Sequence, residues 1–249
     1  MLSKFIILFS TLLSFPLSAF AGRPVPANLR ALYNQAKSRR CGSPVTRNRY
    51  DDGHGRGNFV YCGDRLQSDG IIYITGPSSS TPLADMDIDC DGANHTKGDC
   101  KNDNSGQGQT AFKDEVSKYG IEDLDANKHG YVVLGNERPR YLPSQSGVLS
   151  LSVVAVVCNN QLFYGVWGDT NGENRVGEAS ISLAQACFPD EKLNGDKGHG
   201  AHDVLYVAFR GQDAKPGRNG AAWKARDFNA FEKSLETIGN RLVSKISAN

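Results

Sequence analysis

The sequence predicts a mainly β protein, a compact six-stranded β-barrel with helices on its outside. Three observations support this fold class. At least six short apolar runs have strand character, few segments have the periodicity of a long helix, and several glycine-containing turns separate the runs. An α+β fold is the alternative.

The first 21 residues have the layout of a cleavable signal peptide. Lys4 precedes an apolar run over residues 5–20, which ends in small residues. A membrane anchor is the alternative, but the run is short for a span and no second apolar stretch reaches spanning length. We therefore expect a secreted protein, extracellular or periplasmic, in which residues 22–249 form a single domain.

Six cysteines follow the predicted cleavage site, and the exported context favours their oxidation to three disulfides. Sequence alone does not select one set of pairings, but closeness along the chain favours Cys41–Cys62, Cys90–Cys100 and Cys158–Cys187. Zinc binding is the competing use of cysteine. The sequence has no CxxC spacing, so we expect no zinc site on these residues.

The predicted strands are bounded by turn-forming residues. Outside the acidic segment described below they cover residues 59–62, 71–75, 131–134, 149–157, 161–168 and 204–209. Asn159 and Asn160 favour the positive φ angles of a tight turn, so the fourth and fifth of these strands form a hairpin. A further strand is expected to begin at Glu178 and to continue through Ile181 and Leu183.

Helices are predicted where apolar side chains recur at helical spacing, over residues 28–37, 112–119, 184–188 and 230–247. For the last of them Asn229 is the expected N-cap, with Glu232 three residues later as in a capping box. Its apolar stripe predicts packing against the rest of the protein.

Acidic side chains are concentrated in the middle of the chain. The whole sequence has 28 basic and 27 acidic residues, but residues 85–125 hold eleven acidic side chains against four lysines. Within this segment Asp85, Asp87, Asp89 and Asp91 alternate with apolar residues, which places all four on one face of a strand. Like charges aligned on one face of a strand repel one another and destabilise the fold unless a cation binds to them. This row, the acidic wall, therefore predicts a cationic ligand and argues against nucleic acid.

Calcium is an alternative ligand for the acidic wall. Asp87, Asp89 and Asp91, followed by Gly92, match the first half of an EF-hand loop. However, Gly98 stands where the bidentate glutamate is needed, and no flanking helices are evident. A calcium-stabilised extracellular binding module without an EF-hand is therefore one alternative function.

His199 and His202 precede the last predicted strand in the sequence GHGAHD. Neither an HExxH frame nor a third ligand at metal spacing is visible. The sequence therefore favours turn-forming and hydrogen-bonding roles for these histidines over metal binding.

Two acids lie at the ends of one loop. Asp169 ends an apolar strand, Glu178 begins the next, and the residues between them favour turns. On a polar turn Asp169 should stay ionised, whereas the apolar neighbours of Glu178 should shift it toward its neutral form. Such a pair can act as a base and an acid, and two ordinary loop carboxylates are the alternative.

Six segments of the chain together resemble one family. They are DMDIDCDGAN (85–94), SGQGQTAFKD (105–114), IEDLDANKHGYVVLGN (121–136), LSVVAVVCNNQLFYGVWGDTNG (151–172), VGEASISLAQACFP (176–189) and HDVLYVAF (202–209). In this order they resemble the family 75 glycoside hydrolases, the fungal-type endo-chitosanases. The resemblance implies hydrolysis of chitosan with inversion, with Asp169 and Glu178 as the essential carboxylates. We expect Glu178 to be the general acid, Asp169 the general base, and no cofactor to be required.

The resemblance also suggests a substrate-binding set and a topology. Chitosan carries an ammonium group on most sugars, so Asp85, Asp87, Asp89 and Asp91 would bind it together with Asn171, with Tyr164 and Trp167 as stacking platforms for sugars. The segment VGEASISLAQACF resembles the strand-to-turn segment of double-psi barrels. We expect a monomer that binds neither nucleic acid nor a membrane. A noncatalytic polysaccharide-binding or wall-loosening barrel protein is the second alternative function.

Overall fold

The computed structural model describes residues 22–248 of the 249-residue chain. The predicted signal peptide, residues 1–21, lies outside these residues. Within residues 22–248 no helix is both long enough and apolar enough to cross a membrane.

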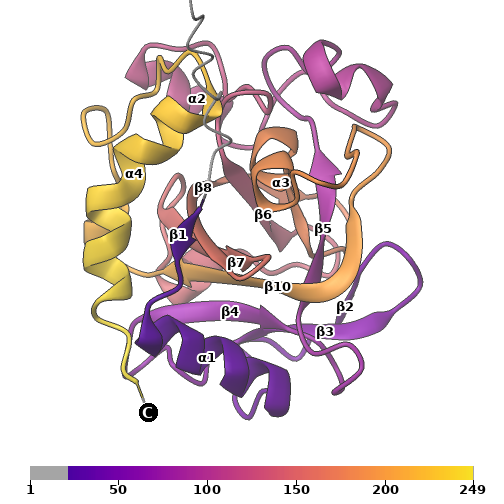
Figure 1. The fold of residues 1–249 in the computed structure, drawn as a ribbon, viewed down its shortest axis with the longest axis vertical. Helices are drawn as coiled ribbons and strands as arrows, with labels where there is room; N and C mark the ends of the chain where they lie inside the picture. Colours follow the sequence, from indigo (N-terminus) through magenta and orange to yellow (C-terminus); the bar gives the residue numbers. More distant parts are fainter. Residues whose placement is uncertain (1–21, 249) are drawn as a thin grey trace, which may run out of the picture.

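Six strands pair with one another in a closed ring (Figure 1). In order around the ring they are β5 (Ala84–Asp89), β9 (Glu178–Ser180), β6 (Tyr131–Asn136), β8 (Gln161–Asn171), β7 (Val153–Cys158) and β10 (His199–Phe209), and β10 pairs with β5 again. The pairs β5–β9 and β6–β8 are parallel, and the other four are antiparallel. Parallel neighbours need long connections, so strands that are distant in sequence lie side by side.

Four further strands extend this ring. β4 (Ile71–Thr75), β3 (Gly57–Cys62) and β2 (Tyr50–Asp51) follow one another outward from β10, and β1 (Arg23–Pro24) pairs with β8. The chain is mostly sheet with a few helices, as the sequence predicted.

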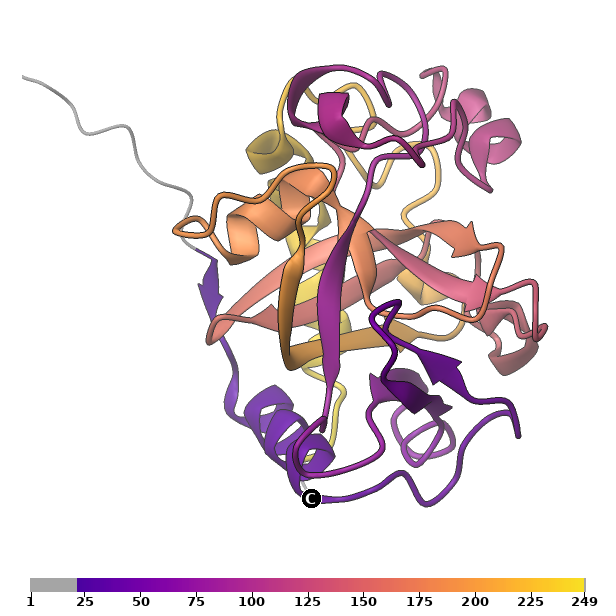
Figure 2. The same ribbon diagram turned by 90° about the vertical axis from the view of Figure 1, so that its right-hand side faces the viewer.

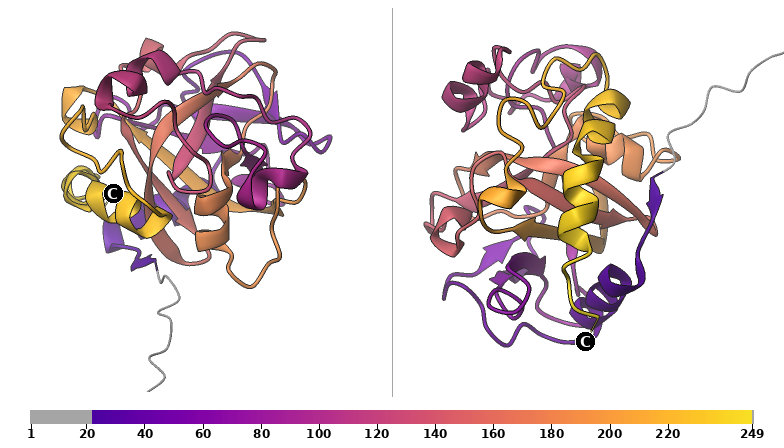
Figure 3. Two further views of the ribbon diagram at one scale, coloured as in Figure 1. Left: turned by 90° about the horizontal axis from the view of Figure 1, so that it is seen from above. Right: turned by 90° about the vertical axis from the view of Figure 1, so that its left-hand side faces the viewer.

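The α-helices are α1 (Ala27–Ser38), α2 (Lys113–Val116), α3 (Ile181–Cys187) and α4 (Phe228–Val243), and the short 3-10 helices are η1 (Gly98–Asn102), η2 (Ser117–Tyr119), η3 (Pro143–Ser146) and η4 (Gln212–Ala214). Each predicted helix has a counterpart among them. Figure 3 shows α4 running along one side of the strands, where it packs against β7 and β8.

The β7–β8 hairpin is confirmed. Asn159 and Asn160 have φ angles of 45° and 58°, the left-handed region that a tight hairpin turn requires. Every residue of β7 is buried, which explains its continuous apolar run. The strand begins at Val153 and not at Leu149, because Leu151 has a φ of 59° and cannot continue a strand.

The predicted strand that begins at Glu178 is wrong in its extent. Ile181 and Leu183 lie in helix α3 and do not extend strand β9, which ends at Ser180. Their apolar side chains are buried in either case, so periodicity over so short a stretch does not distinguish helix from strand.

The N-cap of α4 is Asp227, whose carboxylate accepts a hydrogen bond of 2.9 Å from the Ala230 N–H. The predicted cap, Asn229, lies within the helix. Glu232 is completely buried and does not form a capping box. It pairs with Arg23 of β1 and accepts the Tyr164 N–H of β8 at 3.0 Å, so it joins the start of the described chain to its last helix.

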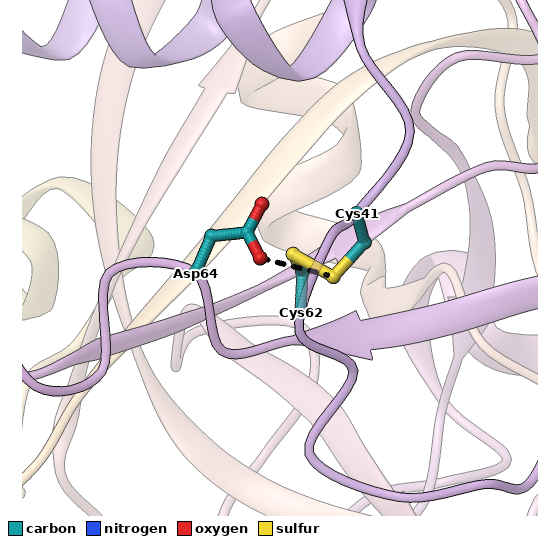
Figure 4. A group of neighbouring side chains, drawn as sticks. All are labelled: Cys41, Cys62 and Asp64. Carbon is teal, nitrogen blue, oxygen red and sulfur yellow. Dashed lines mark hydrogen bonds between the residues drawn. A yellow bond between two sulfur atoms is a disulfide. The ribbon is translucent and has the colours of Figure 1, made fainter.

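All three predicted disulfides are present, Cys41–Cys62, Cys90–Cys100 and Cys158–Cys187. Figure 4 shows Asp64 beside the first of them, with one carboxylate oxygen 3.8 Å from the Cys41 sulfur. Both sulfurs are in the disulfide, so this group offers no thiolate to a metal. Asp64 instead accepts the backbone N–H groups of Gly42 and Ser43.

Candidate active site

The two predicted catalytic acids flank the same residue of the sheet. Val133 of β6 is in register with Asp169 of β8 on one side and with Glu178 of β9 on the other. Residues in register on neighbouring strands point to the same face. The two acids therefore face the same side, two strand spacings of about 4.8 Å apart, or roughly 9 to 10 Å between their Cα atoms.

A β-bulge in β8 gives Asp169 this direction. Trp167 is in register with Val132, and Asp169 with Val133, so Gly168 is the extra residue. Without the bulge Asp169 would point to the opposite face, because side chains alternate along a strand. A Cβ atom at Gly168 would lie 2.6 Å from Leu124 Cδ1 and 2.6 Å from Tyr131 Cβ, so a larger residue does not fit there.

A groove passes over this row of strands in two parts. The first part, about 400 Å³, is lined by both acids and by Asp89, Asp91 and Asn171, among others. The second part, about 530 Å³, is lined by Asp87, His54 and Lys197, among others. Ile88, Ser105, Arg175 and Glu178 line both parts. The groove is therefore continuous, and Glu178 lies near its middle.

Asp169 is only 4% exposed, and this burial raises its pKa to about 8. Its Oδ1 accepts the backbone N–H groups of Ala111 at 2.8 Å and Thr170 at 2.7 Å, which act in the opposite direction by stabilising the anion. The prediction that Asp169 stays ionised on a polar turn is therefore wrong for the free protein. Asp169 lies within strand β8, and desolvation outweighs its two hydrogen bonds.

The environment of Glu178 agrees with the prediction. Desolvation raises the pKa of Glu178 to about 7, and the hydrogen bond from the Asn171 side-chain amide partly offsets this effect. Asn171 thus contacts a predicted catalytic acid directly. Asn171 Oδ1 accepts the Glu173 N–H at 2.8 Å, so this amide is oriented with its nitrogen toward Glu178 as a donor.

Asp89, Asp91 and Asp169 each place a carboxylate oxygen within 4.8 Å of the other two. Burial and mutual repulsion raise the pKa of Asp89 well above its ordinary value, and burial raises that of Asp91 to about 6. The Tyr131 hydroxyl donates to Asp89 Oδ1 at 3.1 Å. These three carboxyls form a single electrostatic cluster that a cation entering the groove would stabilise.

The acidic wall is only partly exposed to the groove. Asp87, Asp89 and Asp91 line it, but Asp85 is 0% exposed and lines neither part. The prediction that Asp85 binds the substrate is therefore wrong, because the hairpin between β2 and β3 and strand β10 cover that end of β5. Asp87 and Asp89 lie on strand β5, and the extended backbone there does not form the turn of an EF-hand.

Tyr164 and Trp167 do not form stacking platforms, because their rings are 0% and 2% exposed. The Tyr164 hydroxyl donates to Asn240 of α4 at 2.8 Å, and Trp167 Nε1 donates to the Asp169 backbone oxygen at 2.9 Å. Tyr164 therefore joins the strands to helix α4, and Trp167 supports the backbone of Asp169 from within the core. Their aromatic character on a strand is equally compatible with a core position, and sequence periodicity did not reveal the bulge.

Several groove residues were missed by the sequence analysis. Sequence patterns predicted no role for residues 105–111, yet the Gln107 N–H donates to Asp91 and the Ala111 N–H to Asp169. Figure 2 shows the loops of residues 90–125 beyond the end of β5, and the β2–β3 hairpin beside that strand. His54 of this hairpin donates from Nε2 to Asp87 Oδ1 at 2.9 Å.

Comparisons with known proteins agree on one family. Residues 86–245 match the model described as "Fungal chitosanase of glycosyl hydrolase group 75". The chain is 49% identical over 231 residues to an endo-chitosanase of Aspergillus oryzae (strain ATCC 42149 / RIB 40), covering 90% of this chain and 92% of that protein. It is also 49% identical over 227 residues to an endo-chitosanase of Aspergillus fumigatus, with the same coverage. An endo-chitosanase C of Aspergillus oryzae is 38% identical over 187 residues, which cover 74% of this chain and 44% of that protein.

Proposed function

The chain belongs to the fungal chitosanases of glycosyl hydrolase group 75 and is a glycoside hydrolase, and on this premise we propose that it cleaves β-1,4 linkages within chitosan with inversion. Glu178 is the general acid and Asp169 the general base. The observation that carries this proposal is the register of both acids with Val133. The register puts both carboxyls on one face, with their Cα atoms roughly 9 to 10 Å apart. An inverting reaction requires roughly 6.5–9.5 Å between the carboxyls, since a water molecule must fit between base and sugar.

The hydrogen bonds support this division of roles. Asp169 accepts two backbone N–H groups, which favour its ionised form, although desolvation outweighs them in the free protein. Ammonium groups of bound chitosan would tip this balance toward the ionised base. Glu178 keeps its proton more readily than a free glutamate because desolvation raises its pKa to about 7, although the Asn171 amide donates to its Oε2. Glu178 would protonate the departing glycosidic oxygen, while Asp169 would take a proton from the water that attacks the anomeric carbon from the other face.

Internal cleavage is supported by the shape of the site. Because Glu178 lies where the two parts of the groove meet, sugars can bind on both sides of the scissile bond. Asp89 and Asp91 on one side, and Asp87 on the other, offer carboxylates to the ammonium groups of the polymer. Purified protein incubated with chitosan should produce new reducing ends together with an early fall in viscosity. Binding without new ends would favour the noncatalytic barrel protein, and activity that only calcium restores after chelation would favour the calcium-stabilised module.

Replacing Asp87 and Asp89 together with Asn is expected to raise KM for chitosan by roughly three- to tenfold and to lower kcat less. Each exposed ion pair contributes up to about 1 kcal/mol, and salt screens it. Steady-state kinetics at low and high ionic strength would measure both effects, with Asp114→Asn on the exposed surface of α2 as the matched control. An unchanged KM at low ionic strength would contradict a role of these residues in binding.

The two raised pKa values also predict how activity depends on pH. The productive form has Glu178 protonated and Asp169 ionised. Because the pKa of the base, about 8, lies above that of the acid, about 7, only a minor fraction of the free enzyme is in this form at any pH, and kcat/KM should peak between pH 7 and pH 8. Bound ammonium groups stabilise the Asp169 carboxylate and lower its pKa, so the acidic limb of kcat should lie at lower pH than that of kcat/KM. Kinetics on a soluble glucosamine oligomer from pH 5 to 9 would test this. Coincident acidic limbs would show that the bound substrate leaves Asp169 unaffected.

The remaining parts of the proposal concern the whole protein. The chain is secreted after removal of residues 1–21, acts as a monomer, and uses residues 22–249 as one catalytic domain. The closed pairing of six strands supports a small barrel, with double-psi connections as its proposed topology. A crystal structure of the secreted enzyme together with its mass in solution would test these statements.

A further inference from the structure

Asp85 poses a problem that the proposed reaction does not solve. Asp85 is 0% exposed, and neither oxygen of its carboxylate has a hydrogen-bond partner among residues 22–248. Burying a carboxyl group without a partner is costly, and native structures contain few such groups. A buried, unsatisfied carboxylate is therefore a sign of a missing ligand.

Two buried side chains surround this carboxylate. Asp52 is 1% exposed, and the side chain of His202 is 5% exposed. One oxygen of Asp52, one nitrogen of His202 and one oxygen of Asp85 all lie within 4.8 Å of one another. His202 Nε2 lies 3.0 Å from Asp52 Oδ2. The three residues come from the β2–β3 hairpin, β5 and β10, which are far apart in sequence but meet here.

A second Asp–His pair lies on the other side of Asp85. One oxygen each of Asp85 and Asp87 and a nitrogen of His54 also lie within 4.8 Å of one another. Asp85 is therefore placed between the pair Asp52–His202 and the pair Asp87–His54. The first pair is buried, whereas the second opens toward the groove, since His54 and Asp87 line its second part.

We propose that Asp85, Asp52 and His202 bind a divalent transition-metal ion such as Zn²⁺ or Mn²⁺, with Asp87 and His54 near enough to complete the coordination. Carboxylate oxygen and imidazole nitrogen together suit these ions. Ligands about 2.0–2.2 Å from Zn²⁺ lie roughly 3–4 Å apart, which fits within the observed 4.8 Å. The ion would coordinate the unpaired carboxylate of Asp85 and would offset the electrostatic repulsion among Asp52, Asp85 and Asp87.

Arg56 opposes this ion in the metal-free state. Its Nη1 lies 3.3 Å from His202 Nδ1 and donates to it, which leaves the proton of His202 on Nε2, facing Asp52. To bind metal through Nε2, the imidazole must carry its proton on Nδ1, so the guanidinium has to move away. Removing the positive charge of Arg56 should therefore tighten metal binding.

The site has a consequence for the groove. His54 and Arg56 of the β2–β3 hairpin line its second part, and the ion would attach this hairpin to β5 and β10. Metal binding is thus expected to stabilise one wall of the groove without taking part in the transfer of protons between Asp169, Glu178 and the substrate.

The test is metal binding by the purified enzyme after chelation and dialysis. Titration with Zn²⁺, Mn²⁺ or Ca²⁺ by calorimetry should show one tight site for Zn²⁺ or Mn²⁺, and that ion should raise the thermal midpoint. Asp85→Asn should weaken binding by at least about tenfold, as loss of a metal ligand or its support does. With chelator present, Asp85→Asn should melt no lower than the unchanged enzyme, because it removes no hydrogen bond of the metal-free protein.

Four further variants locate the ion. Arg56→Gln should bind it more tightly, and His202→Gln should weaken binding as Asp85→Asn does, which keeps the test decisive if either variant folds poorly. Asp89→Asn in the groove cluster and His199→Gln, whose imidazole lies between Glu191 and Asp203, should leave the affinity unchanged. Loss of binding in Asp89→Asn or His199→Gln, retention of full affinity in Asp85→Asn, or no binding by the unchanged enzyme would each overturn the proposal.

Discussion

Glu178→Gln and Asp169→Asn are each expected to lower kcat on chitosan by roughly 10²- to 10⁴-fold while the protein stays folded. An amide can neither give nor take the proton that the reaction transfers, and general acid–base catalysis contributes about this factor. Both substitutions keep the shape of the side chain, so the thermal midpoint should change little. Glu137→Gln, an exposed residue just after β6, is the matched control and should keep full activity.

Azide separates the two roles. A small anion can replace the water that Asp169 activates, but it cannot supply the proton that Glu178 gives. Azide should therefore partly restore Asp169→Asn and leave Glu178→Gln nearly inactive on chitosan. Rescue of Glu178→Gln alone would exchange the two assignments. The anomeric configuration of the first product, followed by NMR, tests the mechanism itself, since retention would require a nucleophile and carboxyls about 5–5.5 Å apart.

Gly168→Ala is expected to lower both stability and activity. The added methyl group would lie 2.6 Å from Leu124 and from Tyr131, a degree of overpacking that costs about 1–3 kcal/mol of unfolding free energy. If the bulge shifts to relieve the contact, Asp169 moves, and a displacement of about 1 Å at a catalytic group can cost roughly 10²-fold in rate.

Gly172→Ala is the matched control for this prediction. It lies in the loop between the same two acids, but a Cβ atom there would have no neighbour within 4 Å. Denaturant unfolding should show little change for Gly172→Ala. Wild-type stability and activity in Gly168→Ala would mean that the bulge does not control the direction of Asp169.

Sequence patterns predicted the structure correctly where the residues that determine it lie close together in the chain. The alternation of residues 85–91 predicted strand β5, although that strand ends at Asp89 and leaves Asp91 outside it. The two asparagines predicted the β7–β8 turn, and closeness along the chain predicted the three disulfides. The apolar neighbours of Glu178 also predicted its raised pKa correctly. The strand and the turn are decided by residues that are neighbours in the chain.

The tertiary structure decided which side chains reach the groove. Asp85 continues the alternation of Asp87 and Asp89, yet the β2–β3 hairpin and β10 bury it, and one extra residue at Gly168 separates the direction of Trp167 from that of Asp169. The high pKa of Asp169 likewise depends on Asp91 and on burial among strands far away in sequence. Periodicity gives the direction of a side chain relative to its own strand, whereas its exposure and its charged neighbours depend on strand pairing and bulges, which long-range packing determines.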